Sequence, residues 1–124
     1  MAKKIMIVDD SMAMRKIIKQ IIAADGFDHV IEAEDGGDAL NKLRLNEDVD
    51  LILTDWNMPQ MDGITFLKTV KSSEAYKNIP VAMITTESAR EEIIEALKSG
   101  AKDYIVKPFK ADIVRDKVKK LLGA

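Results

Sequence analysis

The chain of 124 residues contains no cysteine, one histidine and only 5% aromatic residues. Without cysteine it can form no disulfide, thiolate metal site or thiol nucleophile, and its composition gives no support for secretion. The first apolar run, residues 5–8, ends at two aspartates and is too short for a signal peptide or a membrane span. The formal net charge is only −2, so no global field attracts nucleic acid or an anionic membrane. These absences predict a cytoplasmic protein that binds neither nucleic acid nor membranes.

Glycine-rich phosphate loops are also missing. Neither GxGxxG nor GxxxxGK[ST] occurs in the sequence, which argues against a nucleotide-binding protein. The length suits one core, and 47% hydrophobic with 32% charged residues is typical of a globular domain. We therefore expect a single domain over residues 1–124, with no output domain attached.

Five short apolar runs alternate with segments of helical period. The runs that predict strands are residues 5–8, 29–33, 51–54, 81–85 and 104–106. Apolar residues that predict one buried face in the first helical segment are Met14, Ile17, Ile18, Ile21 and Ile22, and those in the fourth are Ile93, Ile94 and Leu97. Strict alternation of this kind predicts an α/β fold, a (βα)5 doubly wound parallel sheet with helices on both faces.

Four of the predicted strands end in polar side chains. Asp9 and Asp10 follow the first strand, Asp55 the third, Thr85 ends the fourth, and Lys107 follows the fifth. Singly, each is most simply a turn, cap or solvated residue. Together they would meet at the edge where parallel sheets bind ligands. Two carboxylates ~4 Å apart repel by about 4 kcal/mol at an effective dielectric constant of 20, so we expect a hard divalent cation there, with Mg²⁺ favoured.

Several stretches carry a family resemblance. VDD near the start, TDWNMPQMDG, TTE after the fourth strand and KPF after the fifth resemble the receiver domains of bacterial response regulators. EAEDGGDALNKL, DWNMPQMDG and VKPF are most similar to the chemotaxis members of that family. The similarity covers essentially the whole chain. It implies a flavodoxin-like strand order, 2-1-3-4-5.

The resemblance also implies a role for each strand-end residue. Asp55 would be the phosphoacceptor, a carboxylate nucleophile that takes a phosphoryl group from a histidine kinase. Asp10, Asp55 and the backbone carbonyl of Asn57 would hold Mg²⁺ directly, and Asp9 would act through a water. Lys107 would bind one phosphoryl oxygen.

Other positions follow from the same resemblance. The Thr85 hydroxyl would bind a second phosphoryl oxygen, while Asn57 and Glu87 would flank the group and tune its hydrolysis. The Lys107–Pro108 peptide bond is predicted to be cis. One residue departs from the family pattern: Lys110 stands where chemotaxis members often have a threonine that caps the last helix.

The implied function is signalling, with no catalysis beyond the protein's own phosphorylation and dephosphorylation. A chemotaxis histidine kinase, the flagellar motor switch protein and a phosphatase are the implied partners of a monomer. Its output face would be formed by the fourth helix, fifth strand and fifth helix. Residues expected on that face are Arg90, Ile93, Tyr104 and Lys117.

Other functions fit the sequence less well. A receiver that acts as a phosphate sink, or regulates a process other than motility, is the nearest alternative. A flavodoxin-like electron carrier is disfavoured because Asp9 and Asp10 would repel a flavin phosphate. A Mg²⁺-dependent phosphohydrolase of the haloacid-dehalogenase type needs a second acid two residues after the nucleophile, where this chain has Asn57.

Overall fold

A computed structural model describes residues 3–86 and 90–123 of the chain. The five strands are β1 (Lys4–Val8), β2 (His29–Ala33), β3 (Leu51–Asp55), β4 (Val81–Thr85) and β5 (Asp103–Val106). The five helices are α1 (Met12–Ala23), α2 (Gly36–Leu45), α3 (Gly63–Ser72), α4 (Arg90–Lys98) and α5 (Ala111–Leu122). Strands and helices alternate along the whole chain, as predicted.

The strands form one parallel sheet in the order β2-β1-β3-β4-β5, which confirms the predicted fold and strand order. The direction in which the chain adds strands reverses between β1 and its neighbour β3. Ligands of such sheets bind at the carboxyl ends of the strands, beside this switch point. A site is therefore expected at the loops after β1 and β3.

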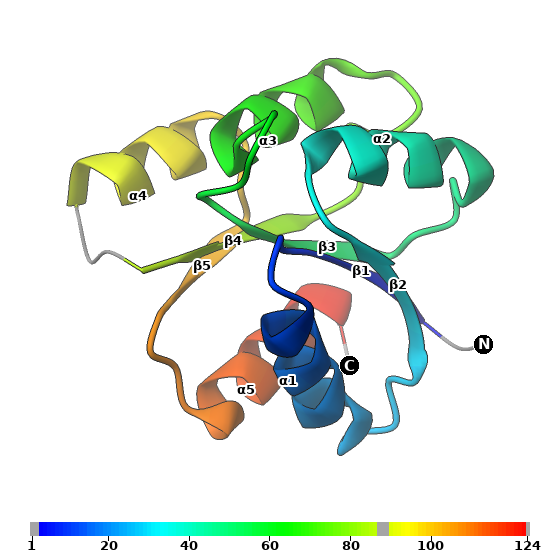
Figure 1. Ribbon diagram of the computed structural model, residues 1–124, viewed down its shortest axis with the longest axis vertical. Helices are drawn as coiled ribbons and strands as arrows, with labels where there is room; N and C mark the ends of the chain where they lie inside the picture. Colours follow the sequence, from blue (N-terminus) through cyan, green and yellow to red (C-terminus); the bar gives the residue numbers. More distant parts are fainter. Residues whose placement is uncertain (1–2, 87–89, 124) are drawn as a thin grey trace.

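Helices cover both faces of the sheet: α2, α3 and α4 lie on one side, and α1 and α5 on the other (Figure 1). Alternate strand residues face opposite layers, so Met6 and Val8 pack with the first set and Ile5 and Ile7 with the second. The central strand β3 is buried at every position. Two layers of apolar side chains therefore hold the carboxyl end of β3 in a fixed place.

Two helices end at glycines in the left-handed region of φ. Gly26 has a φ of 85° and Gly100 a φ of 110°, values that an L side chain rarely adopts. The amide after each glycine, at Phe27 and Ala101, bonds to the carbonyl five residues earlier, as in a Schellman motif. At the start of α5, Lys110 occupies the N-cap position without a side-chain hydrogen bond, but the helix begins at the next residue.

The predicted helix faces were wrong at three positions. Ile17 of α1 is 45% exposed, and Ile94 and Leu97 of α4 are 42% and 43% exposed. Periodicity locates an apolar stripe but not its width, and α4 is anchored chiefly through the buried Ala96.

None of the helices that the structure describes is long and apolar enough to cross a membrane.

Candidate functional site

Three carboxylates meet at the carboxyl end of the sheet. Asp9 and Asp10 follow β1 and Asp55 ends β3, and each offers an oxygen within 4.8 Å of the others. Asp9 and Asp55 are buried, whereas Asp10 is exposed. This arrangement follows from the pairing of β1 with β3, whose last paired residues are Val8 and Thr54. The oxygen donors and their spacing suit a hard divalent cation, with Asp10 on the solvent side.

Hydrogen bonds hold both the backbone and the carboxylate of Asp9. Its amide donates to the Ala33 carbonyl at 3.0 Å, and its Oδ1 accepts from the Ser11 amide at 2.9 Å. Its own carbonyl accepts from Arg15 Nη1 at 2.6 Å, and its Oδ2 accepts from Lys107 Nζ at 3.3 Å. The backbone and carboxylate groups of Asp9 thus already have hydrogen-bond partners within the protein.

Lys107 compensates the two buried acids together. Its Nζ lies 3.3 Å from Asp9 Oδ2 and 3.3 Å from Asp55 Oδ1. The Lys107 amide also donates to the Thr85 carbonyl at 2.7 Å, which joins the ends of β4 and β5. The Lys107–Pro108 bond is cis, as predicted. Thr85 itself is buried at the end of β4, next to this lysine.

The electrostatic state of Asp55 follows from its burial. Desolvation raises the pKa of Asp55 above the ordinary carboxyl value, Lys107 opposes this shift, and the charge of Asp9 adds to it. The carboxylate also accepts a hydrogen bond from the Trp56 amide at 2.9 Å. The raised pKa means that the ionised form pays a cost here that a bound cation would relieve.

The loop after β3 must pass very close to the strand end. The Gly63 amide donates to the Trp56 carbonyl at 2.8 Å. A Cβ on Gly63 would lie 2.2 Å from the Asp55 carbonyl oxygen and 2.9 Å from the Trp56 Cα, so only glycine fits. Gln60, in the same loop, adopts a φ of 70°. The loop thus folds back so that Gly63 lies against the backbone of Asp55 and Trp56.

The structure brings together Asp9, Asp10, Asp55 and Lys107, with Thr85 joined to Lys107 through the backbone. Asn57 is exposed in the loop directly after β3, and Glu87 lies outside the described residues. Sequence reasoning missed two contributors, Ser11 and Arg15, which both bond to Asp9. The N-cap position of Ser11 was a readable signal, since a serine precedes the first helix. No sequence pattern pointed to Arg15.

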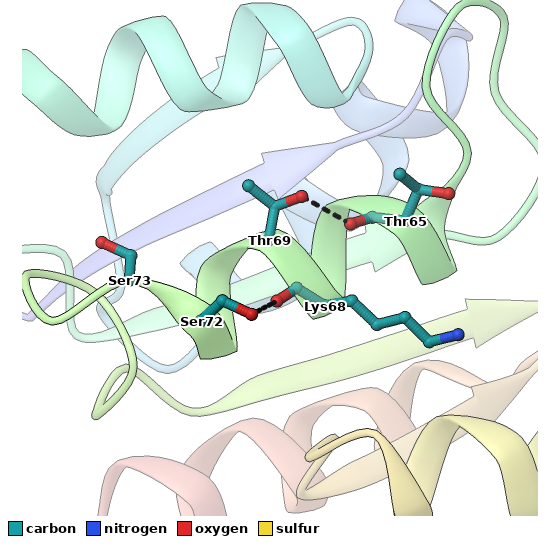
Figure 2. A pocket seen from close by; sticks show the side chains of 5 residues that line it. All are labelled: Thr65, Lys68, Thr69, Ser72 and Ser73. Atoms are coloured by element: carbon teal, nitrogen blue, oxygen red, sulfur yellow. Dashed lines mark hydrogen bonds between the residues drawn. The ribbon is translucent and has the colours of Figure 1, made fainter.

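A separate hollow lies on the outer face of α3 (Figure 2). Its lining residues are Thr65, Lys68, Thr69, Ser72 and Ser73. The Thr69 hydroxyl donates to the Thr65 carbonyl and the Ser72 hydroxyl to the Lys68 carbonyl, each at 2.8 Å. These hydroxyls serve the helix itself, and no residue of the acidic cluster lines the hollow. It is a surface feature of α3 without the chemistry found at the strand ends.

Known proteins share both the sequence and the fold. Residues 5–119 match the family model of the response regulator receiver domain. The chain is 46% identical to the chemotaxis protein CheY1 of Helicobacter pylori over 97% of each chain. It is 48% identical to the chemotaxis protein CheY-3 of Vibrio cholerae over 95% of this chain and 90% of that one.

Solved structures agree with this assignment. The chemotaxis response regulator CheY4 of Vibrio cholerae superimposes with a TM-score of 0.89 at 34% identity, covering 98% of this chain and 100% of that chain. A response regulator receiver domain from Francisella gives a TM-score of 0.87 at 35% identity, covering 98% of this chain and 97% of that chain. Receiver domains are signalling proteins that generally bind Mg²⁺ at an acidic pocket, which matches the three carboxylates found here. The chain therefore belongs to the family of response regulator receiver domains.

Proposed function

We propose that the protein is a chemotaxis response regulator that is phosphorylated on Asp55. The observation that carries this proposal is the position of Asp55, buried at the end of the central strand and 3.3 Å from the Lys107 ammonium. The names of the relatives, which are chemotaxis proteins of nearly equal length, support the biological setting. A chemotaxis histidine kinase is the proposed donor, in the cytoplasm.

The transfer forms one bond and breaks one bond. An Asp55 carboxylate oxygen attacks the phosphorus of a phosphohistidine; the O–P bond forms, the N–P bond breaks, and the imidazole leaves with the electron pair. The Trp56 amide and Lys107 both bond to Oδ1 of Asp55, which leaves Oδ2 as the attacking oxygen. Lys107 and the Thr85 hydroxyl would bind oxygens of the transferred group and fix its orientation.

The acidic cluster would hold Mg²⁺. We propose Asp10, Asp55 and the backbone carbonyl of Asn57 as direct ligands, with Asp9 acting through a water. When bound, the ion would neutralise charge on the phosphoryl oxygens. The separate contacts of Asp9 with Ser11 and Lys107 support its indirect role.

The output face is proposed on α4, β5 and α5. It carries the exposed apolar side chains Ile94 and Leu97 of α4, beside the partly buried Ile93. Isolated exposed apolar residues are ordinary on a surface, but two on one short helix favour a docking site. The flagellar motor switch protein is the proposed partner, and a phosphatase would reset the signal.

Phosphorylation would reach this face through Thr85 and Tyr104. Tyr104 pairs in register with Met83, and Met83 and Thr85 lie on the same face of β4, the face covered by α4. A Thr85 that moves toward the phosphoryl group would leave room for the Tyr104 ring on that face. In this structure the ring lies partly exposed, with Lys117 Nζ 4.6 Å from its centroid. The two residues would form one switch that both phosphorylation and the partner bias.

The test is phosphorylation of Asp55→Asn by acetyl phosphate in the presence of Mg²⁺, followed by intact mass spectrometry. The amide has nearly the same shape but no anionic nucleophile, so labelling should disappear. Asp62→Asn is the matched control because Asp62 caps α3 through the Thr65 amide, and asparagine caps equally well. The Asp62→Asn control should label like wild type. EDTA should prevent labelling of both wild type and Asp62→Asn. Labelling of Asp55→Asn at the wild-type level would refute the proposal.

A further inference from the structure

Arg15 stands in an electrostatically unusual place. It is the fourth residue of α1, and no acidic residue occupies the first turn of that helix. The amino end of a helix carries a partial positive charge, so a cation there gains nothing from the helix dipole. Its side chain is nevertheless only 13% exposed. A guanidinium is held at such a position only by specific acceptors.

Among the described residues the guanidinium donates to two acceptors, one in the turn after β1 and one in β2. Nη1 donates to the Asp9 carbonyl at 2.6 Å, and Nε donates to Glu32 Oε1 at 3.0 Å. Glu32 belongs to the edge strand β2 and is also 3.5 Å from Lys19 Nζ. Arg15 therefore ties the turn after β1 to the strand next to it, through the planar fork that only arginine provides.

The Asp9 carbonyl is the peptide oxygen directly before Asp10. Any rotation of that peptide plane would move the Asp10 carboxylate, which is exposed. On the other side of the turn, the Asp9 amide is fixed to Ala33 at 3.0 Å. The carbonyl end of the turn is fixed by Arg15. Together the two contacts fix the backbone from which the Asp10 side chain projects.

We propose that Arg15 is a positioning residue for the cation site: it holds the peptide between Asp9 and Asp10 so that the acidic pair converges on Asp55. Glu32 in turn orients the guanidinium. This inference rests on the proposed function, in which Asp10 is a direct Mg²⁺ ligand. Groups that orient metal ligands without touching the metal typically contribute 10- to 100-fold in affinity.

The sign of the effect separates positioning from simple electrostatics. Arg15 is a positive charge near an acidic cluster, so a purely electrostatic role predicts that removing it strengthens binding of a cation. A role confined to packing predicts a lower free energy of unfolding and no change in the Mg²⁺ affinity of the folded protein. Only positioning predicts weaker Mg²⁺ binding.

The experiment is a MgCl₂ titration followed by amide chemical shifts in NMR spectra, at a temperature where each variant is folded. Arg15→Met should raise the Kd for Mg²⁺ about tenfold or more. Arg15→Lys should fall between wild type and Arg15→Met, because an ammonium keeps the charge but cannot span both acceptors. Lys19→Met is the matched control: it removes a cation from the same Glu32 without touching Asp9, and its Kd should stay within about twofold of wild type.

Glu32→Gln gives a second, milder test, because the amide oxygen can still accept from Arg15; we expect a smaller loss of affinity than in Arg15→Met. An unchanged or lower Kd in Arg15→Met, with normal binding by wild type, would overturn the role of Arg15. Wild-type protein that shows no shifts with MgCl₂ would instead overturn the proposed function, and this inference with it.

Discussion

Removing the charge of Asp55 should stabilise the protein when no divalent cation is bound. The acidic oxygens of Asp9, Asp10 and Asp55 lie within 4.8 Å of one another, and at that distance two carboxylates repel by about 3.5 kcal/mol at an effective dielectric constant of 20. The ammonium of Lys107, 3.3 Å from Asp55, attracts it by about 5 kcal/mol on the same basis. Two repulsions exceed one attraction by about 2 kcal/mol.

Two further effects modify this balance in opposite directions. Asp10 is exposed, so solvent weakens its repulsion, whereas burial adds a desolvation cost for the ionised Asp55. We expect Asp55→Asn to be more stable than wild type by about 1–2 kcal/mol, or about 5 °C in melting temperature. Urea denaturation in EDTA, followed by circular dichroism, measures the difference. Glu47→Gln, the same chemical change at an exposed position, should stay within about 0.5 kcal/mol of wild type.

The advantage of Asp55→Asn should also depend on pH. The pKa of Asp55 is raised in the folded state, so as pH falls the folded protein binds a proton before the unfolded chain does. The destabilisation by Asp55 is therefore fully present above the folded-state pKa. It is relieved as pH falls toward the ordinary value of 3.8, and the two proteins should converge there.

Mg²⁺ should also reduce the difference in free energy of unfolding between Asp55→Asn and wild type, because it stabilises wild type more. Wild type gains about 1.4 kcal/mol when free Mg²⁺ is about tenfold above its Kd, and the variant should gain less because it lacks one ligand. A variant that is less stable than wild type in EDTA at neutral pH would refute the electrostatic account of the cluster. It would show that the contact with Lys107 outweighs the crowding of the three acids.

Three other changes test separate parts of the site. We expect Trp56 fluorescence to change on Mg²⁺ addition, since the buried indole follows Asp55 directly. Asp10→Ala should abolish that change, and an unaltered titration would remove Asp10 from the ligand set. Gly63→Ala should lower the free energy of unfolding by more than about 2 kcal/mol in urea titrations, because its Cβ would meet backbone atoms at 2.2 and 2.9 Å; a stability equal to wild type would mean that the loop can move aside. Thr85→Ala should still accept phosphate from acetyl phosphate but lose most of the phosphorylation-dependent gain in partner affinity, measured by pull-down; a wild-type gain would refute the coupling through Tyr104.

Much of this architecture could be predicted from local sequence. The alternation of apolar runs and helical segments predicted the class of fold, because both faces of a parallel sheet must be covered. The order of the strands could not be obtained that way, since alternation is compatible with several orders; it came from the family resemblance. The convergence of Asp9, Asp55 and Lys107 was predictable because parallel strands end at one edge of a sheet.

The errors and omissions have a common physical cause. Ile17, Ile94 and Leu97 fit the helical period but lie at the margin of their stripes, and whether a marginal residue is buried depends on the neighbouring element. Arg15 was missed for the related reason that its partners are a backbone carbonyl and a residue 17 positions away. Neither relation leaves a mark on local composition.

The site nevertheless depends on such unmarked contacts. Predicted ligands such as Asp10 and Asp55 determine which chemistry the strand ends can support. That chemistry can be inferred from the residue types alone. Whether the ligands converge depends on groups such as the Gly63 backbone, which lies against the Asp55 carbonyl, and the Arg15 guanidinium, which holds the Asp9 carbonyl. Both act on the main chain and not on the ligand side chains. The affinity of the acidic cluster for a cation should therefore respond to changes at positions that no ligand pattern includes.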